Sequence, residues 1–90
     1  MAQTASLTFQ HNDEARPIIE AILADNADVR VMSLPGAVKL DRDGSLVVKR
    51  ASVEERIGRA WDPQEIHLVI ISMAGNLDED DDQFTLSWRH

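Results

Sequence analysis

Two short apolar runs near the C-terminus constrain the fold of this 90-residue chain more than any other feature. Residues 66–71 are almost entirely apolar, a pattern typical of a strand buried on both faces of a sheet. Residues 84–88 alternate apolar and polar side chains, which is typical of a strand with one solvated face. We therefore expect a central strand at the first run and a strand near an edge at the second, with Phe84, Leu86 and Trp88 facing inward.

Shorter alternating runs predict four more strands, which turn residues separate. Pro35-Gly36 should form one turn. Asp43-Gly44 favours a tight hairpin, because both residues tolerate the positive backbone dihedrals that such a turn requires. The expected strands cover residues 6–10, 29–32, 37–40 and 46–48.

Two short helices are expected between the strands. The first has apolar residues at spacings of three and four, and Pro17 fits it only if the regular helix begins near Arg16. Residues 25–26 should end it. The second begins with the capping-box pattern Ser52-Val53-Glu54-Glu55 and ends at Gly58. The apolar stripe of the first helix consists of Ala15, Ile18, Ile19, Ile22 and Leu23.

The order of these elements predicts an α+β fold. Strand, helix, strand, strand is followed by the same order again, which indicates two βαββ halves with mixed or antiparallel sheets and two short helices. A chain of this length suits one small domain that buries roughly 60 to 65% of its unfolded surface. We expect residues 1–90 to form a single compact domain in which the two halves share one core.

The acidic composition limits the classes of partner. The formal net charge is −7, and subtracting the five acids at residues 78–82 from 16 leaves 11, against 9 Lys and Arg. Binding to duplex DNA depends on basic groups that neutralise phosphates, so a nucleic-acid ligand is not expected. The sequence has no cysteine and no apolar run near the roughly 20 residues of a membrane span. We therefore expect a cytoplasmic protein that does not enter membranes.

Sequence motifs for catalysis, metals and cofactors are missing. His11, His67 and His90 are far apart and form no closely spaced ligand pair. His67 has apolar neighbours, which favours a packed or sheet-edge imidazole over a general base. The four glycines form no phosphate-binding loop, and no serine lies in a nucleophile motif. We therefore expect a chain that is not an enzyme and that binds no metal or cofactor of its own.

Three roles fit the acidic run at residues 78–82. It can be a solvated segment that protects a sheet edge from aggregation, a weak divalent-cation site, or an electrostatic contact for a basic partner. The sequence leaves these three roles open. An acidic interaction module, or a nucleic-acid mimic that inhibits a basic protein, is accordingly an alternative function.

Three segments, in their order along the chain, resemble the small regulatory (coupling, or effector) proteins of bacterial multicomponent diiron monooxygenases, and most closely the phenol hydroxylase component. The segments are residues 12–22 (NDEARPIIEAI), residues 53–62 (VEERIGRAWD) and residues 75–88 with the acidic run. The resemblance implies the monooxygenase regulatory protein fold and a cofactor-free effector that binds a large diiron hydroxylase. It further implies control of substrate access, oxygen activation and electron coupling to a flavin and iron–sulfur reductase during phenol hydroxylation.

By this resemblance, the segment after the expected central strand makes the contact with the hydroxylase. Gly75 would permit close backbone approach, Asn76 offers hydrogen-bond donors and acceptors, and Met73 adapts to an irregular apolar surface. An ordinary turn is the other interpretation of this segment. The expected contact residues are Ser72, Met73, Ala74, Gly75, Asn76 and Leu77, and the expected electrostatic rim is Asp78, Glu79, Asp80, Asp81 and Asp82.

Overall fold

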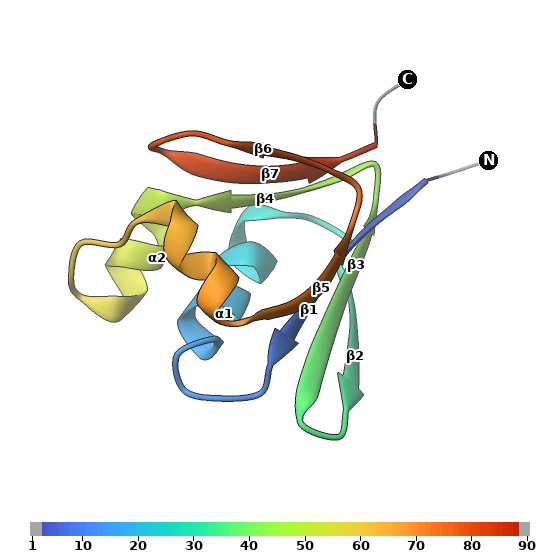
Figure 1. The fold of residues 1–90 in the computed structure, drawn as a ribbon, viewed down its shortest axis with the longest axis horizontal. Helices are drawn as coiled ribbons and strands as arrows, with labels where there is room; N and C mark the ends of the chain where they lie inside the picture. The colour runs from blue at the N-terminus through green and yellow to red at the C-terminus, as the bar shows by residue number, and fades with distance from the viewer. Residues whose placement is uncertain (1–2, 89–90) are drawn as a thin grey trace.

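The computed structural model describes residues 3–88, which form two antiparallel sheets and three short helices (Figure 1). The strand order is β2-β3-β1-β5 in the four-stranded sheet and β4-β7-β6 in the three-stranded sheet. The predicted α+β class is confirmed, with a third helix, η1, that the sequence did not predict. In chain order the elements are β1 (Thr4–Gln10), α1 (Arg16–Asp25), β2 (Arg30–Leu34), β3 (Ala37–Asp43), β4 (Ser45–Lys49), α2 (Arg50–Ile57), η1 (Pro63–Leu68), β5 (Ile70–Ala74), β6 (Asn76–Glu79) and β7 (Gln83–Ser87).

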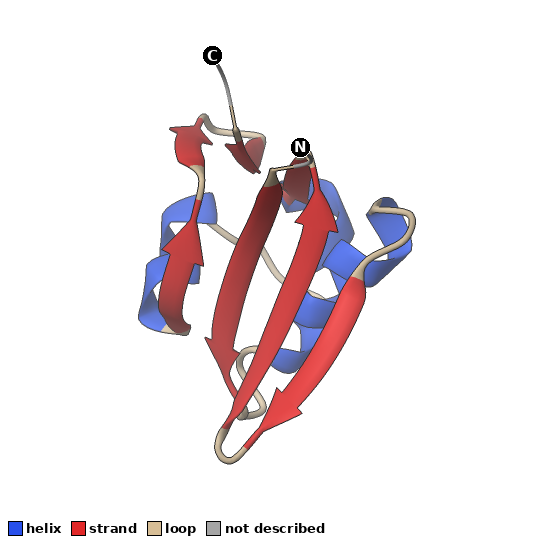
Figure 2. Ribbon diagram, turned by 90° about the vertical axis from the view of Figure 1, so that its right-hand side faces the viewer, coloured by secondary structure: helices blue, strands red, loops and turns tan. Residues whose placement is uncertain are grey.

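The helices lie on one face of the four-stranded sheet and leave its other face uncovered (Figure 2). One cluster of buried apolar residues joins both sheets to all three helices. Leu7 and Phe9 of β1, Ile22 of α1, and Phe84 and Leu86 of β7 are fully buried in it. Burial of a side chain of this size stabilises a fold by about 1.5–3 kcal/mol. None of the helices within residues 3–88 has the length and apolar content needed to span a membrane.

The first helix and the hairpin after it form as predicted. α1 begins at Arg16, so Pro17 lies in the first turn, where its missing N–H costs no helical hydrogen bond. The Oδ1 of Asn12 accepts a hydrogen bond from the N–H of Ala15 (2.9 Å) just before the helix. β2 and β3 then pair across Pro35-Gly36. These elements depend on signals within a few residues, which explains why the sequence predicts them well.

The predicted hairpin at Asp43-Gly44 is wrong, because β3 and β4 belong to different sheets. β3 pairs with β1 and β2, whereas β4 pairs with β7. Gly44 does adopt a positive φ of +92°. Its N–H donates to the carbonyl of Gln3 (2.8 Å), and its carbonyl accepts from the N–H of Trp88 (3.3 Å). The turn signal is therefore correct locally, but it makes a corner between two sheets.

The start of the strand predicted at residues 66–71 is instead the end of η1. Asp62 and Glu65 form a capping box, in which each side chain accepts a hydrogen bond from a backbone N–H at the helix start (3.0 and 2.9 Å). Pro63 and Ile66 are buried three residues apart, the period of a 3-10 helix. The capping box and the proline therefore outweigh the strand propensity of this apolar run.

α2 also begins differently from the prediction. The pattern at Ser52–Glu55 does not cap the helix, which starts at Arg50 without a side-chain hydrogen bond from Lys49. The N–H of Arg50 instead donates to the carbonyl of Asp82 (2.8 Å), so the turn before β7 satisfies one of the free amides of the first helical turn. Gly58 ends the helix at a φ of +73°, as predicted.

The places of the last strands are reversed relative to the prediction: β5 is an edge strand and β7 is central in its sheet. β7 is central because β6, which consists of Asn76, Leu77, Asp78 and Glu79, covers one side of it. Phe84 and Leu86 face the core as predicted. Trp88 does not, because its side chain is 40% exposed and its Nε1 donates to the carbonyl of Thr4 (2.7 Å).

Candidate functional site

The six predicted contact residues form the crossing from one sheet to the other. Ser72, Met73 and Ala74 end β5, and Asn76 and Leu77 begin β6, so that Gly75 alone separates the two strands. Both strands lie at an edge of their sheets. Apart from the partly buried glycine, every residue of this segment is exposed. The segment is therefore an accessible strand edge with a bend, and not the turn that the sequence suggests.

Gly75 is required by contacts within the chain. Its φ is +136°, and a Cβ at this position would lie 3.0 Å from Cγ and 3.2 Å from Cδ1 of Leu86. Contacts at 3.0 Å are closer than packed carbon atoms tolerate. The close approach that requires glycine here is to Leu86 of the same chain, whereas the family resemblance assigned it to a contact with the partner.

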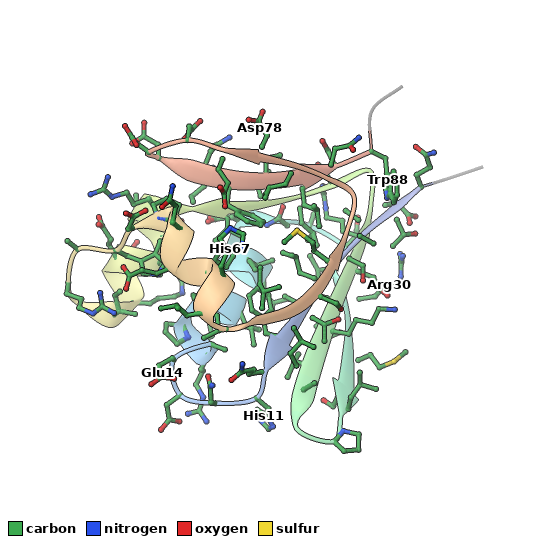
Figure 3. The ribbon with its side chains drawn as sticks, in the orientation of Figure 1. His11, Glu14, Arg30, His67, Asp78 and Trp88 are labelled. Carbon is green, nitrogen blue, oxygen red and sulfur yellow. The ribbon has the colours of Figure 1, made fainter. Side chains whose placement is uncertain are left out.

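The acidic run extends from β6 into the hairpin turn that leads to β7. Asp78 and Glu79 lie in β6, and the other three acids form the turn. The Oδ1 of Asp80 accepts hydrogen bonds from the backbone N–H groups of Asp82 and Gln83 (2.8 Å each). All five acids are exposed, and Asp78 points away from the helices (Figure 3). Within the described part of the chain, no three potential ligands are grouped to hold a metal ion.

His67 connects η1 to β6 (Figure 3). Its Nε2 is paired with Oε1 of Glu79, and its ring meets Phe84 edge-on with centroids 5.9 Å apart and an interplanar angle of 64°. The edge contact with Phe84 fits the predicted packed imidazole only in part, because the side chain of His67 is still 42% exposed and the residue lies in a 3-10 helix and not in a strand. His11 lies in the loop after β1, and His90 is outside the described residues.

Arg50 ties the acidic turn to α2. Its Nη1 donates to the carbonyl of Asp81 (3.2 Å), and its Nε donates to Oε2 of Glu54 (3.1 Å). The same Oε2 accepts from the N–H of Trp61 (2.7 Å). The hydrogen bond from Trp61, followed by that from Arg50, holds the pKa of Glu54 below its usual range. The network supports the acidic turn from the helix side, so the acids are presented on a structured edge.

Sequence reasoning missed both supports of the acidic run. Arg50 and Asp81 are 31 residues apart, and His67 and Glu79 are 12 residues apart. The Asp62-x-x-Glu65 capping box could have predicted η1, and with it the helical position of His67. The sequence contains no comparable signal for the contact of Arg50 with the acidic turn.

A family model and a curated relative match nearly the whole chain. The model of the MmoB/DmpM family matches residues 3–87. The stimulatory component DmpM of phenol 2-monooxygenase from Pseudomonas sp. (strain CF600) is 41% identical over 90 residues, which is the full length of both chains.

Solved structures show the same arrangement of elements. A chain from a phenol hydroxylase–regulatory protein complex matches with a TM-score of 0.93 and 41% identity, covering 97% of this chain and all of that chain. A chain from another structure of such a complex matches with a TM-score of 0.89 and 38% identity, over 96% of this chain and all of that chain. The soluble methane monooxygenase regulatory protein B shares the fold, with a TM-score of 0.77 at 23% identity over 96% of this chain and 65% of its own.

Proposed function

The chain belongs to the MmoB/DmpM family, and from this premise we propose that it is the non-catalytic regulatory component of a multicomponent phenol, or aromatic, hydroxylase. One observation carries the proposal: the chain is 41% identical, over its full length, to a stimulatory component of phenol 2-monooxygenase. The similarity to a chain in a phenol hydroxylase–regulatory protein complex supports a role through binding.

The proposed partner is the large diiron hydroxylase. A regulator of this kind changes substrate access, oxygen activation and electron coupling by binding one conformation of the hydroxylase more tightly than another, since equal affinity shifts no equilibrium. A preference of about 1.4 kcal/mol changes the ratio of the two conformations tenfold. The diiron site and the chemistry belong to the hydroxylase in this proposal, and the regulator contributes binding energy.

The proposed contact surface is the strand edge at residues 72–77 with the acidic run beside it. Its exposure and its place at the edges of both sheets support this assignment. The acids at residues 78–82 are the proposed rim, which raises the association rate with a basic surface and orients the two proteins. The hydrogen bonds of Asp80 and Arg50 support the turn that carries three of these acids.

Three finer features belong to the same proposal. Electrons would reach the hydroxylase from a flavin and iron–sulfur reductase, whose coupling to product formation the regulator affects. Residues 1–90 would act as one regulatory domain, which the core shared by both sheets supports. The complex would operate in the cytoplasm.

Reconstitution of the hydroxylase and the reductase with and without this protein tests the proposal. We expect the protein to increase phenol turnover and the fraction of NADH oxidation that leads to hydroxylated product. A sample of the protein unfolded by heat serves as the control for nonspecific effects of added protein. Unchanged turnover together with unchanged coupling would refute the regulatory role.

The acidic-module alternative predicts a different result. Such a module would bind unrelated basic proteins in a strongly salt-dependent manner, because exposed charges are screened over about 8 Å at physiological ionic strength. Binding of lysozyme and of the hydroxylase should be compared across a salt series. Selective binding of the hydroxylase at physiological salt favours the regulatory function.

A further inference from the structure

Two side chains of the proposed contact segment lie on the core side of the sheets and are nevertheless exposed. Met73 pairs with Leu7 across β5 and β1, and Leu77 pairs with Leu86 across β6 and β7. Residues directly opposite in an antiparallel pair point to the same face of the sheet. Leu7 and Leu86 are fully buried, whereas Met73 and Leu77 are 36% and 41% exposed. The hydrophobic core is therefore open at these two positions, which we call the open seam.

The topology explains why residues 3–88 do not cover the open seam. β5 and β6 are edge strands of different sheets, and they follow each other in the chain with Gly75 between them. The seam thus lies where both sheets end. η1 approaches β6 through the pairing of His67 with Glu79. The side chain of Glu79 lies on the same face of β6 as that of Leu77, because alternate residues of a strand share a face. The contact closes the core at Glu79 and leaves Leu77 exposed beside it.

The other face of the same segment differs in chemistry. Ser72 pairs with Thr8, and Ala74 pairs with Ser6, on the uncovered face of the four-stranded sheet (Figure 2). That face presents hydroxyl groups and small side chains together with the ion pair of Lys39 and Asp41 (3.5 Å). The register therefore divides the contact segment into an apolar inner side and a polar outer side, a division that the sequence pattern alone did not predict.

The charge around the open seam indicates what can cover it. Residues 60–88 contain no Lys or Arg, and Asp78 follows Leu77 directly. The two cations that line a pocket with Met73 are each paired with an acid: Lys39 with Asp41 (3.5 Å) and Arg30 with Asp43 (3.1 Å). A second copy of this chain at the same edge would place two acidic runs close together, which is unfavourable. A basic surface that carries an apolar side chain matches the seam in both charge and polarity. The acids of this region are Asp62, Glu65, Asp78, Glu79, Asp80, Asp81 and Asp82.

We infer that the hydroxylase places an aliphatic or aromatic side chain, flanked by Lys or Arg, against Met73 and Leu77 and so covers the exposed part of this protein's core. The inference rests on the proposed function, and it names two residues of the proposed contact segment as the ones that anchor the hydroxylase. The thioether of Met73 adapts to such a side chain, and removal of both residues from water contributes the hydrophobic part of the binding energy. The acids provide steering and orientation, and the open seam provides the anchor.

Oxidative footprinting tests this inference on the unaltered protein. Hydrogen peroxide transfers one oxygen atom to a methionine sulfur and leaves as water, and the sulfoxide is located by mass spectrometry of peptides. Met73 in the seam and Met32 on β2 are both exposed, at 36% and 53%, and lie at opposite edges of the four-stranded sheet. Excess hydroxylase should slow the oxidation of Met73 several-fold and leave that of Met32 unchanged. A stable complex in which Met73 oxidises at its free rate would overturn the inference.

Alanine variants provide a second measurement. Met73→Ala and Leu77→Ala should each weaken the affinity for the hydroxylase about tenfold, as expected of anchor residues in an interface. Val31→Ala is the matched control, because Val31 pairs with buried Leu40 on the core side and is 51% exposed at the opposite edge. The affinity of the Val31→Ala variant for the hydroxylase should stay within about twofold of the wild-type value, which is the scale of near-neutral contacts.

The outcomes separate failure of the inference from failure of the proposed function. If the wild-type protein does not bind the hydroxylase at all, the proposed function fails. If the wild type binds and both seam variants bind equally well, the regulatory function stands and the seam inference is refuted. Sedimentation of the protein alone tests whether a second copy of this chain covers the seam instead. A dimer that Leu77→Ala abolishes and Val31→Ala retains would assign the seam to that second copy and overturn the inference.

Discussion

Replacement of Gly75 by alanine tests whether the bend between β5 and β6 is set by packing inside the chain. The new Cβ would lie 3.0 Å from Cγ of Leu86, 3.2 Å from its Cδ1 and 3.4 Å from the carbonyl oxygen of Ser87. Leu86 is fully buried and central in the three-stranded sheet, so it has little freedom to move away. The φ of +136° is a further obstacle, because residues with a Cβ rarely adopt it.

The expected loss of stability follows from three contributions. The unfavourable backbone conformation costs about 1–3 kcal/mol, and overpacking against Leu86 costs about 1–3 kcal/mol more. The reduced freedom of alanine in the unfolded chain offsets about 0.4–1 kcal/mol. The sum is about 3 kcal/mol, a large share of the roughly 5–13 kcal/mol expected for a domain of this size. For such a small domain, the melting temperature should fall by about 12–24 °C.

Urea denaturation monitored by circular dichroism measures this loss. Gly58→Ala is the matched control, since Gly58 has a φ of +73° but, its chain neighbours and the backbone of its own helix aside, no atom of residues 3–88 lies within 4 Å of the position that a Cβ would take there. That variant should lose only about 1 kcal/mol, because it meets backbone strain without a clash. The smaller valine makes room for the new methyl group. The double variant Gly75→Ala with Leu86→Val should therefore lose about 0.5–2 kcal/mol less stability than the sum of the two single variants. If Gly75→Ala is no less stable than Gly58→Ala, the packing argument is refuted.

Three further predictions concern the loss of stability at acidic pH, the helix caps and the acidic rim. The hydrogen bond from Trp61, then that from Arg50, keeps the pKa of Glu54 below its ordinary 4.5. Its stabilisation is therefore present above pH 4.5 and lost as the pH falls through the lower folded value. Urea midpoints of the wild type and Glu54→Gln should converge in acid, and a constant gap would contradict this. Asp62→Ala should lower stability by about 1 kcal/mol, and Ser52→Ala by less than about 0.5 kcal/mol, because Asp62 caps η1 whereas Ser52 does not cap α2. Equal losses in chemical denaturation would be evidence against that assignment. The double variant Asp81→Asn with Asp82→Asn should slow association with the hydroxylase, most strongly at low salt. Stopped-flow rates that depend on neither salt nor the substitutions would rule out steering.

The elements that the sequence predicts correctly are those whose signals are local. Pro17 and the apolar spacing after it predict a helix that begins near Arg16, and the structure places the start of α1 there. Pro35-Gly36 predicts the β2–β3 turn, and Gly58 predicts the end of α2. Each signal acts through the backbone conformation of a few neighbouring residues, so no distant segment is needed to interpret it.

The sequence also located the candidate site along the chain, through the resemblance of whole segments to a family. The family membership is confirmed, whereas the contact role of residues 72–77 and the rim role of residues 78–82 stay predictions. The structure supplies a reason for Gly75 that the sequence did not show, since the atoms that exclude a side chain belong to Leu86 of the same chain. A sequence pattern shows that a glycine is present and does not show which surface approaches it.

Which strands are neighbours and which lie at an edge depends on the tertiary structure. The apolar run at residues 66–71 suggested a central strand, yet β5 is an edge strand because no strand within residues 3–88 pairs with its outer side. Leu77 and Leu86 each lie between two polar residues in the sequence. Leu77 is nevertheless exposed and Leu86 buried, because β6 ends the sheet and β7 lies inside it. Strand pairing depends on the burial of segments that are distant in the chain, and the free energy of that burial is a property of the whole fold. The acidic edge and its open seam exist for this reason only in the folded molecule.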